Sequence, residues 1–345
     1  MTEDTYFHWL VNETPTEWWH DSGDLGELEA AMAYAASGVT MNPILAHQAL
    51  QAAPEYWRER IGALPPDLDP VEKAQKLTHA VVTAAAEKLA PQHRASNGAT
   101  GYVCAQVNPQ DAGDRESMLA MARKFHAWAP NIAVKLPVTA AGLDVLETCV
   151  AEGITITATV SFTVPQVVAA AKRHRKGAAR AREAGITPGH CFAVIMIGRL
   201  DDYLRDVAWD NHAEVSESDI RQAGLAATKR AYRIFQDEGF EAVLLIAALR
   251  GTYHMIELAG ADFIMSIHPR YQAMLLDPGV PREQRIDQPV DPQVIERLQT
   301  LPEFIRSYEP DGMAPWEFIT YGASQKTLSQ FDHVGWSMLE SFDLF

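Results

Sequence analysis

The sequence predicts an α/β fold, a single (β/α)8 (TIM) barrel over residues 1–345 with a C-terminal helical extension that begins at about residue 283. Three observations support this fold: a repeated helix–glycine–strand unit, a total of about eight strand-like runs, and the chain length. A length of 345 residues fits either one large barrel domain or two domains of about 150 residues each. An open doubly wound sheet is the alternative, but no glycine-rich GxGxxG motif follows the first predicted strand.

The repeated unit predicts parallel strands that alternate with helices. In each unit a helical stretch ends in a glycine, and a β-branched or apolar run follows. A glycine that ends a helix in the left-handed conformation and leads into a strand is typical of a parallel α/β fold. Three further strand-like runs, at residues 16–21, 101–107 and 131–136, complete the set of strands. The glycines of the repeated unit are Gly38, Gly153, Gly185, Gly239 and Gly260.

Composition and charge exclude several classes of protein. With 47% hydrophobic residues, the chain is neither fibrous nor disordered. The 29 Lys and Arg against 45 Asp and Glu give a net charge of −16, which repels nucleic acid and anionic membrane surfaces. A phosphate-bearing ligand must therefore be held by a local group of arginines.

The cellular setting follows from cysteine usage and from the start of the chain. The three cysteines, Cys104, Cys149 and Cys191, are odd in number and far apart, which fits a reducing compartment without disulfides. Residues 1–8 contain no basic segment leading into an apolar one, so no signal peptide is expected. No stretch approaches the roughly 18 apolar residues of a membrane span. We expect a soluble, cytoplasmic protein.

Lys135 is the first candidate for chemistry. It lies in the run Ile132-Ala-Val-Lys-Leu-Pro137, with apolar residues on both sides. An exposed strand residue is one interpretation. If the side chain is instead buried, desolvation lowers the pKa of the amine and makes it a nucleophile toward a carbonyl.

Other polar residues fall at the predicted carboxyl ends of strands, where barrel enzymes carry their active sites. Asp21 ends the first strand and is either a general acid/base or a helix N-cap. Thr40 and Asn42 follow the second strand, and Pro43 holds Asn42 extended. Gln106 ends the third strand.

The fifth and later strands add hydroxyls and two arginines. Alternation along Thr155-Ile-Thr-Ala-Thr-Val-Ser161 places its four hydroxyl residues, Thr157 and Thr159 among them, on one face. Arg199 and Arg250 follow the sixth and seventh strands and suit a phosphate or another oxyanion.

The order of these motifs resembles the transaldolase family, class I Schiff-base aldolases built on a (β/α)8 barrel. The similar segments run in family order from about residue 16 to residue 275. They are His20-Asp-Ser-Gly-Asp24, Gly38-Val-Thr-Met-Asn-Pro43, Val134-Lys-Leu136, Gly153-Ile-Thr-Ile-Thr-Ala-Thr-Val-Ser-Phe162, Ile197-Gly-Arg199 and Leu258-Ala-Gly-Ala-Asp262.

The resemblance implies a role for each matching residue. Lys135 would form an imine with the carbonyl of a ketose donor, and Asp21 would be the general acid/base at the C4 hydroxyl. The other implied roles are water binding by Thr159, binding of donor hydroxyls by Thr40 and Asn42, and binding of the substrate phosphate by Arg199 and Arg250.

Several positions depart from the family pattern. Gln106 stands where transaldolases carry a glutamate, which resembles the fructose-6-phosphate aldolase subgroup. That subgroup pairs its glutamine with a tyrosine, but Met196 occupies the aligned position here. Thr157 replaces an asparagine beside the lysine, and we expect it to contact substrate. A glutamine can orient a water but cannot take its proton, so the proton route differs from that of the family.

The expected function is transfer of a dihydroxyacetone unit from a ketose phosphate to an aldose phosphate through a lysine Schiff base, without metal or organic cofactor. Three alternatives stay open: an aldolase that releases the donor fragment, a metal-dependent barrel using His20, Asp21, Asp24 and His268, and an inactive sugar-phosphate binding protein. We expect sugar phosphates as partners, but no nucleic acid or membrane. The sequence allows a homodimer and leaves the subunit count open.

Three further features are interpreted structurally. The basic run Lys172-Arg-His-Arg-Lys176 is expected on a solvated helix face. The aromatic residues after about residue 283 are expected to pack on the barrel exterior or on a partner subunit. His268 and Tyr253, beyond the eighth and seventh strands, are candidates for a modified acceptor pocket.

Overall fold

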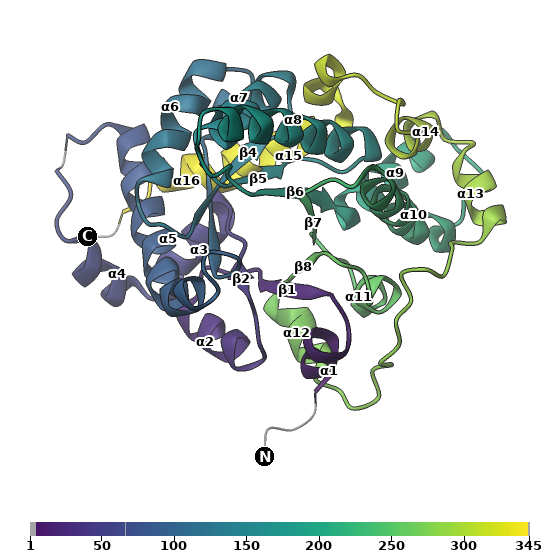
Figure 1. Ribbon diagram of the computed structural model, residues 1–345, viewed down its shortest axis with the longest axis horizontal. Helices are drawn as coiled ribbons and strands as arrows, with labels where there is room; N and C mark the ends of the chain where they lie inside the picture. Colours follow the sequence, from purple (N-terminus) through teal and green to yellow (C-terminus); the bar gives the residue numbers. More distant parts are fainter. Residues whose placement is uncertain (1–4, 66, 344–345) are drawn as a thin grey trace.

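The protein is a closed barrel of eight parallel strands that follow one another in chain order. The computed structural model describes residues 5–65 and 67–343. Helices surround the ring of strands (Figure 1), and a helical segment follows the eighth strand. The predicted (β/α)8 barrel with C-terminal helices is therefore confirmed.

The strands are short, and each is followed by at least one helix. The strands are β1 (Glu17–His20), β2 (Gly38–Val39), β3 (Tyr102–Gln106), β4 (Ile132–Pro137), β5 (Ile156–Thr159), β6 (Cys191–Met196), β7 (Val243–Ala247) and β8 (Ile264–Ile267). The helices up to β8 are α1 (Tyr6–Glu13), α2 (Leu25–Ala33), α3 (Pro43–Ala52), α4 (Pro54–Ile61), α5 (Pro70–Ala95), η1 (Pro109–Asp111), α6 (Arg115–His126), α7 (Ala140–Ala151), α8 (Val164–Glu183), α9 (Ile197–Asp210), α10 (Glu217–Glu238) and α11 (Thr252–Leu258). The later helices are α12 (Pro269–Leu275), α13 (Pro292–Leu298), α14 (Pro302–Tyr308), η2 (Pro315–Thr320), α15 (Gly322–Phe331), the π-helical turn η3 (Asp332–Trp336) and α16 (Ser337–Glu340).

The strand register decides which side chains enter the barrel. Side chains alternate across a strand, and paired residues of parallel strands share a face. Lys135 of β4 pairs with Gln106 on one side and Thr157 on the other. Lower in the barrel, the Trp19 and Phe192 rings meet edge to face at 4.7 Å. The lumen is thus apolar below and polar toward the carboxyl ends of the strands.

The end of β5 differs from the predicted strand. The predicted hydroxyl face ran from Thr155 to Ser161, but β5 ends at Thr159. Val160 adopts a left-handed conformation with φ of 52°, which is strained for a β-branched residue. The turn moves Ser161 off the strand, and its hydroxyl donates to the carbonyl of Val194 at 2.6 Å. Ser161 therefore does not continue the row of lumen hydroxyls.

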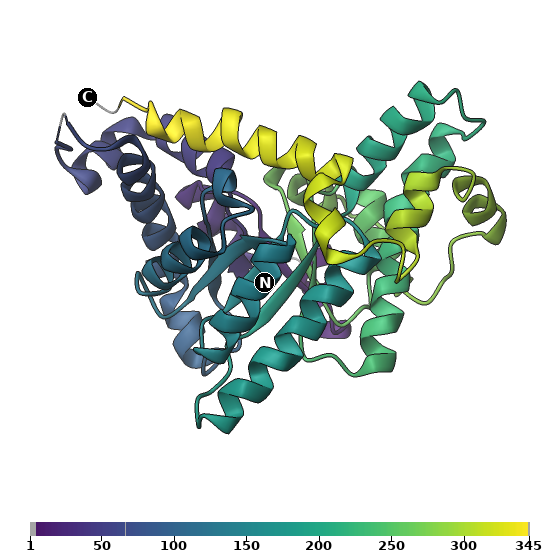
Figure 2. The same ribbon diagram turned by 90° about the horizontal axis from the view of Figure 1, so that it is seen from above.

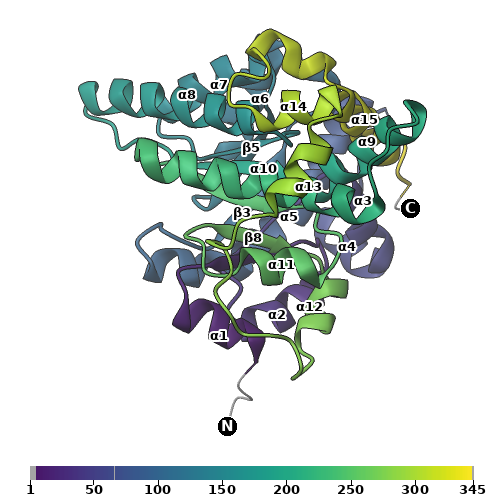
Figure 3. The same ribbon diagram turned by 90° about the vertical axis from the view of Figure 1, so that its right-hand side faces the viewer.

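The basic run lies on α8, which packs beside α10 (Figure 3). Arg173 pairs with Asp144 and Glu147, and Arg182 pairs with Glu241 at 2.6 Å. These charges lie on a partly exposed helix face, as predicted. None of the helices in residues 5–65 and 67–343 is long and apolar enough to cross a membrane.

The C-terminal segment from α15 to α16 forms one long rod, drawn in yellow in Figure 2. It packs against α3, α5 and α9, and also against η1. A β-carbon on Gly335 of the π-helical turn would lie 2.8 Å from Pro43, so glycine allows this close approach to the start of α3. Since α3 and α9 begin where β2 and β6 end, the rod reaches the carboxyl ends of the strands.

A close contact inside the barrel gives a stability prediction. A β-carbon on Gly38 would lie 2.5 Å from the Trp19 indole. We expect Gly38→Ala to reduce the free energy of unfolding by about 1–3 kcal/mol, because the added methyl overpacks the core. Urea denaturation measures the change. The control is Gly113→Ala, whose nearest neighbour would be 3.7 Å away and whose effect should stay within about 0.5 kcal/mol. Equal stability of the two variants would contradict the packing described for Gly38.

Candidate active site

The Lys135 side chain is enclosed by the barrel. The residue is 5% exposed, and its Nζ donates to the backbone carbonyl of Met41 at 3.3 Å. This contact joins β4 to the segment after β2, so the amine lies across the carboxyl end of the lumen. The exposed-strand interpretation of Lys135 is wrong, because its neighbours in the register face inward with it.

Burial sets the electrostatics of this amine. Loss of solvent lowers the pKa of Lys135 below its ordinary value, and the charge of Arg199 lowers it further. The Cys104 thiol and the Asp21 carboxylate act in the opposite direction. Because desolvation is the largest effect, the neutral, nucleophilic form of the amine is more accessible than in an exposed lysine.

Asp21 is held by a hydroxyl and does not cap a helix. The Thr40 hydroxyl donates to Oδ1 of Asp21 at 2.6 Å and lies 2.5 Å from the Ser266 hydroxyl. Asp24 caps α2 instead, since its Oδ1 accepts the backbone N–H groups of Gly26 and Glu27. The N-cap interpretation of Asp21 is therefore wrong, and its carboxylate is left for the lumen.

Two polar atoms at the ends of β3 and β5 are buried without a partner among the described residues. The Oε1 atom of Gln106 and the Oγ1 atom of Thr159 accept or donate no hydrogen bond among the described residues. Native proteins leave few buried polar atoms unsatisfied, and such atoms mark places for water or ligand. The neighbouring Thr157 hydroxyl is already used, since it lies 3.3 Å from the Cys104 sulfur.

Asn42, which follows β2, is the N-cap residue of α3. Its side-chain oxygen caps α3 by accepting the backbone N–H groups of Ile44 and Leu45 at 2.9 and 3.1 Å. The residue is extended, with φ of −142° and ψ of 170°, as its place before Pro43 predicts. The amide NH2 of Asn42 makes no hydrogen bond to any residue that the structure describes, so it is the part of the side chain left for a ligand.

Arg199 is a largely desolvated cation at the start of α9. Burial and the nearby charge of Arg250 lower the pKa of Arg199 to about 10. Its Nη1 donates to Oε1 of Gln330 at 2.6 Å, and its guanidinium lies 5.2 Å from the centre of the Phe331 ring. Among the described residues no carboxylate lies within ion-pair distance of this guanidinium. A partly buried cation that makes no direct ion pair is suited to hold an anionic ligand.

Arg250 differs from Arg199 in having its charge already paired. Its Nε and Nη2 donate to one oxygen of Asp202 at 3.0 and 2.7 Å. Its Nη1 donates to the carbonyl of Ala248 at 2.8 Å. Ala248 is left-handed, with φ of 56°, so the turn after β7 is shaped around the arginine. The backbone N–H of Arg250 donates to Nδ1 of His254 at 3.2 Å.

The two remaining candidates have local partners. His268 caps α12 through its side chain, which accepts the backbone N–H of Arg270 at 3.2 Å. The Tyr253 ring lies 4.4 Å from the Arg221 guanidinium. Within residues 5–65 and 67–343, no three His, Cys, Asp or Glu residues are grouped to hold a metal ion. The described residues therefore give no support to the metal-dependent alternative.

Sequence reasoning missed four residues that contact the candidate site. Ser266 lies within an apolar run, and its position across β1 from Thr40 depends on the barrel register. Asp202 follows Arg199 closely but pairs with Arg250. Gln330 and Phe331 reach Arg199 from a helix more than a hundred residues later. No local signal in the sequence marks these contacts.

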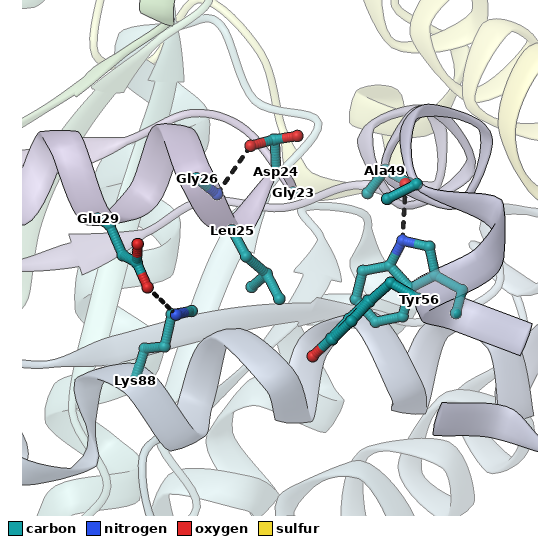
Figure 4. Close-up of a pocket in the computed structure, with 10 residues that line it drawn as sticks. Gly23, Asp24, Leu25, Gly26, Glu29, Ala49, Tyr56 and Lys88 are labelled. Carbon is teal, nitrogen blue, oxygen red and sulfur yellow. Dashed lines mark hydrogen bonds and ion pairs between the residues drawn. The ribbon is translucent and has the colours of Figure 1, made fainter. Parts of the chain in front are cut away.

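A cavity of about 270 Å³ lies outside the barrel and is separate from this site (Figure 4). The side chains of Leu25, Tyr56 and Trp57 line it, and the Glu29–Lys88 ion pair lies at one edge. The Trp57 indole donates to the carbonyl of Ala49 at 2.7 Å. The residues that line this cavity do not include Lys135, Asp21 or either of the two arginines.

The fold and site define a (β/α)8 barrel protein with a desolvated lysine, an aspartate and two arginines at the carboxyl ends of its strands. The chain matches the family described as Transaldolase/Fructose-6-phosphate aldolase over residues 18–311, and it belongs to that family.

Curated relatives agree with this family and are distant. The chain is 29% identical over 212 residues to a transaldolase of Neisseria meningitidis, covering 60% of this chain and 58% of the relative. It is 31% identical over 183 residues to a transaldolase of Neisseria gonorrhoeae, covering 52% of each. It is 28% identical over 221 residues to transaldolase 1 of Streptomyces avermitilis, covering 63% of this chain and 58% of the relative. The chain thus matches less than two thirds of the length of these relatives.

The buried amine gives a prediction on pH. Because the folded-state pKa of Lys135 is lowered, the charged amine disfavours folding below the unfolded pKa of about 10.4. We expect Lys135→Met to raise the free energy of unfolding relative to wild type by about 0.5–3 kcal/mol at pH 7. The difference should shrink at about pH 11, where the unfolded amine is also neutral. Urea denaturation at both pH values measures it.

The matched control for this experiment is Lys76→Met at an exposed position. Its difference from wild type should be the same at both pH values. If the difference in free energy of unfolding between Lys135→Met and wild type did not change with pH, the result would contradict the desolvation of the Lys135 amine.

Proposed function

We propose that the protein is a transaldolase-type enzyme, a transferase of aldehyde and ketone residues. It moves a dihydroxyacetone unit from a ketose phosphate, such as fructose 6-phosphate, to an aldose phosphate. The observation that carries the proposal is the enclosed Lys135 amine on the same inner layer as Gln106 and Thr157, with Asp21 close enough to influence its charge.

In the first half of the reaction Lys135 supplies the electron sink. Its neutral amine adds to the C2 carbonyl of the ketose, and loss of water leaves an imine. Asp21 then takes the proton of the C4 hydroxyl as the C3–C4 bond breaks and the aldehyde leaves. The electron pair left on C3 is delocalised into the protonated imine, so the carbanion is never isolated.

In the second half the acceptor aldehyde takes the place of the first product. C3 attacks the acceptor carbonyl, and Asp21 returns its proton to the new alkoxide. Water then hydrolyses the imine and frees Lys135. The unpartnered Gln106 and Thr159 atoms are suited to hold the water used in the imine steps. Gln106 orients this water without accepting its proton.

The substrate phosphate would bind between the two arginines. Arg199 makes no ion pair with a described carboxylate, whereas Arg250 is already paired with Asp202. Arg199 therefore gives the larger share of anion binding in this proposal. Asn42 contributes its amide NH2 to the hydroxyls of the donor.

An aldolase that releases dihydroxyacetone to solution is the second candidate function. Gln106 favours it, because a glutamine at this position resembles the fructose-6-phosphate aldolase subgroup. Met196 on β6 counts against it, since that subgroup carries a tyrosine there. Rates of aldehyde release with and without an aldose phosphate acceptor separate the two functions.

The test of the mechanism is reductive trapping. Borohydride added with fructose 6-phosphate should attach one donor-derived mass per chain, and peptide mapping should place it on Lys135. Lys135→Met should abolish the adduct, while the surface control Lys76→Met should keep it. An adduct on another lysine would contradict the proposal, as would binding of several ketose phosphates without any adduct, which defines an inactive binding protein.

The anion site gives a second test. Arg199→Ala should raise KM for fructose 6-phosphate by about ten- to hundredfold, the effect of losing a charge-assisted bond. KM for unphosphorylated dihydroxyacetone should change much less. Arg250→Ala should act in the same direction but more weakly, because its charge is already paired. Equal effects of Arg199→Ala on both substrates would show that the guanidinium does not bind phosphate.

A further inference from the structure

Two buried hydroxyls form a chain that ends on Asp21. Ser266 on β8 and Thr40 after β2 are each 1% exposed. Their oxygens lie 2.5 Å apart, and the Thr40 oxygen lies 2.6 Å from Oδ1 of Asp21. β8 and β2 both pair with β1, so the two hydroxyls meet across the strand that leads into the aspartate.

The direction of these hydrogen bonds follows from counting protons. An ionised carboxylate only accepts, so Thr40 must donate its single proton to Asp21. With its proton committed, Thr40 can only accept from Ser266. Ser266 is therefore the donor, and the order of donation is Ser266 to Thr40 to Asp21.

We propose that Ser266 is a positioning residue that acts through Thr40 to orient Asp21 for carbon–carbon bond cleavage. This inference rests on the proposed function. With Oδ1 held by Thr40, the other carboxylate oxygen, Oδ2, is the one presented to the C4 hydroxyl of the donor. A carboxylate fixed at one oxygen keeps the other at a constant place, and such pre-organisation speeds proton transfer.

The same count restricts how Thr40 can meet substrate. Its proton is used by Asp21 and one lone pair is used by Ser266, so one lone pair remains. Thr40 can accept a hydrogen bond from a donor-sugar hydroxyl but cannot donate one. The carbonyl of a substrate would therefore find no partner in Thr40, whereas a hydroxyl would.

The alternative is that Ser266 only fills space. A small buried hydroxyl on an inward strand position can satisfy itself on nearby backbone. In this structure the Ser266 oxygen approaches the Thr40 hydroxyl. Among the described residues, the only other side-chain partner of that hydroxyl is Asp21. Removing the Ser266 hydroxyl would leave Thr40 free to rotate, and its bond to Asp21 would lose its fixed direction.

The experiment measures single-turnover release of aldehyde from fructose 6-phosphate, together with borohydride-trapped adduct. Ser266→Ala should slow aldehyde release by about three- to tenfold, the effect of one neutral hydrogen bond. The amount of trapped adduct and KM should stay near wild type, because Asp21 transfers no proton in the proposed imine-forming step and Ser266→Ala leaves its charge in place. Ser266→Thr, which keeps the hydroxyl, should restore aldehyde release to within about twofold.

A double-mutant cycle with Thr40→Val shows whether Ser266 acts through Thr40. Ser266→Ala should have no further effect on aldehyde release in the Thr40→Val background. Additive effects of the two substitutions on the rate would contradict the proposed Ser266–Thr40–Asp21 hydrogen-bond chain. An unchanged release rate for Ser266→Ala would contradict it as well. A loss of thermal stability with an unchanged release rate would assign Ser266 to packing and overturn the proposal. If wild-type protein forms no adduct at all, the proposed function fails, and that outcome is distinct from each of these.

Discussion

The exclusion of water from the Lys135 amine is the constraint on which the rest of the site depends. A lysine in water is protonated at neutral pH and cannot attack a carbonyl. Inside the barrel its charged form is disfavoured by desolvation and by Arg199. The ring of strands supplies this environment, because the register places Lys135 between Gln106 and Thr157 on the inner face. In the proposed mechanism the closed barrel is therefore a chemical requirement as well as a scaffold.

Enclosure also explains why the C-terminal helices matter. The rod from α15 to α16 contacts Arg199 through Gln330 and Phe331 and packs against α3. It therefore packs near the end of the lumen where the polar residues gather. The same contacts desolvate Arg199, and a desolvated cation attracts a phosphate more strongly than one in water. One segment thus contacts Arg199 and lies near the carboxyl ends of β2 and β6.

Much of this arrangement could be predicted from sequence, where the signal is local. Glycines between helices and strands predicted the barrel, and apolar neighbours allowed burial of Lys135. The N-cap residue of α2 could not be assigned from the sequence. Asp21 and Asp24 are both suitable N-cap residues, and the choice depends on the residue at which the helix begins. The predicted fifth strand extends beyond the observed end of β5, because valine rarely adopts the left-handed conformation that Val160 has here. The Ser266–Thr40 contact depends on the barrel register, which no single segment encodes.

The most direct measurement of the central claim is a titration of the amine itself. The protein would carry ¹³C at Cε of its lysines, and the spectrum of a Lys135→Arg variant would assign the Lys135 resonance. This account predicts that the Lys135 resonance titrates at a lower pH than those of the surface lysines. A Lys135 resonance that moves together with the surface lysines would show a hydrated amine and would contradict the account.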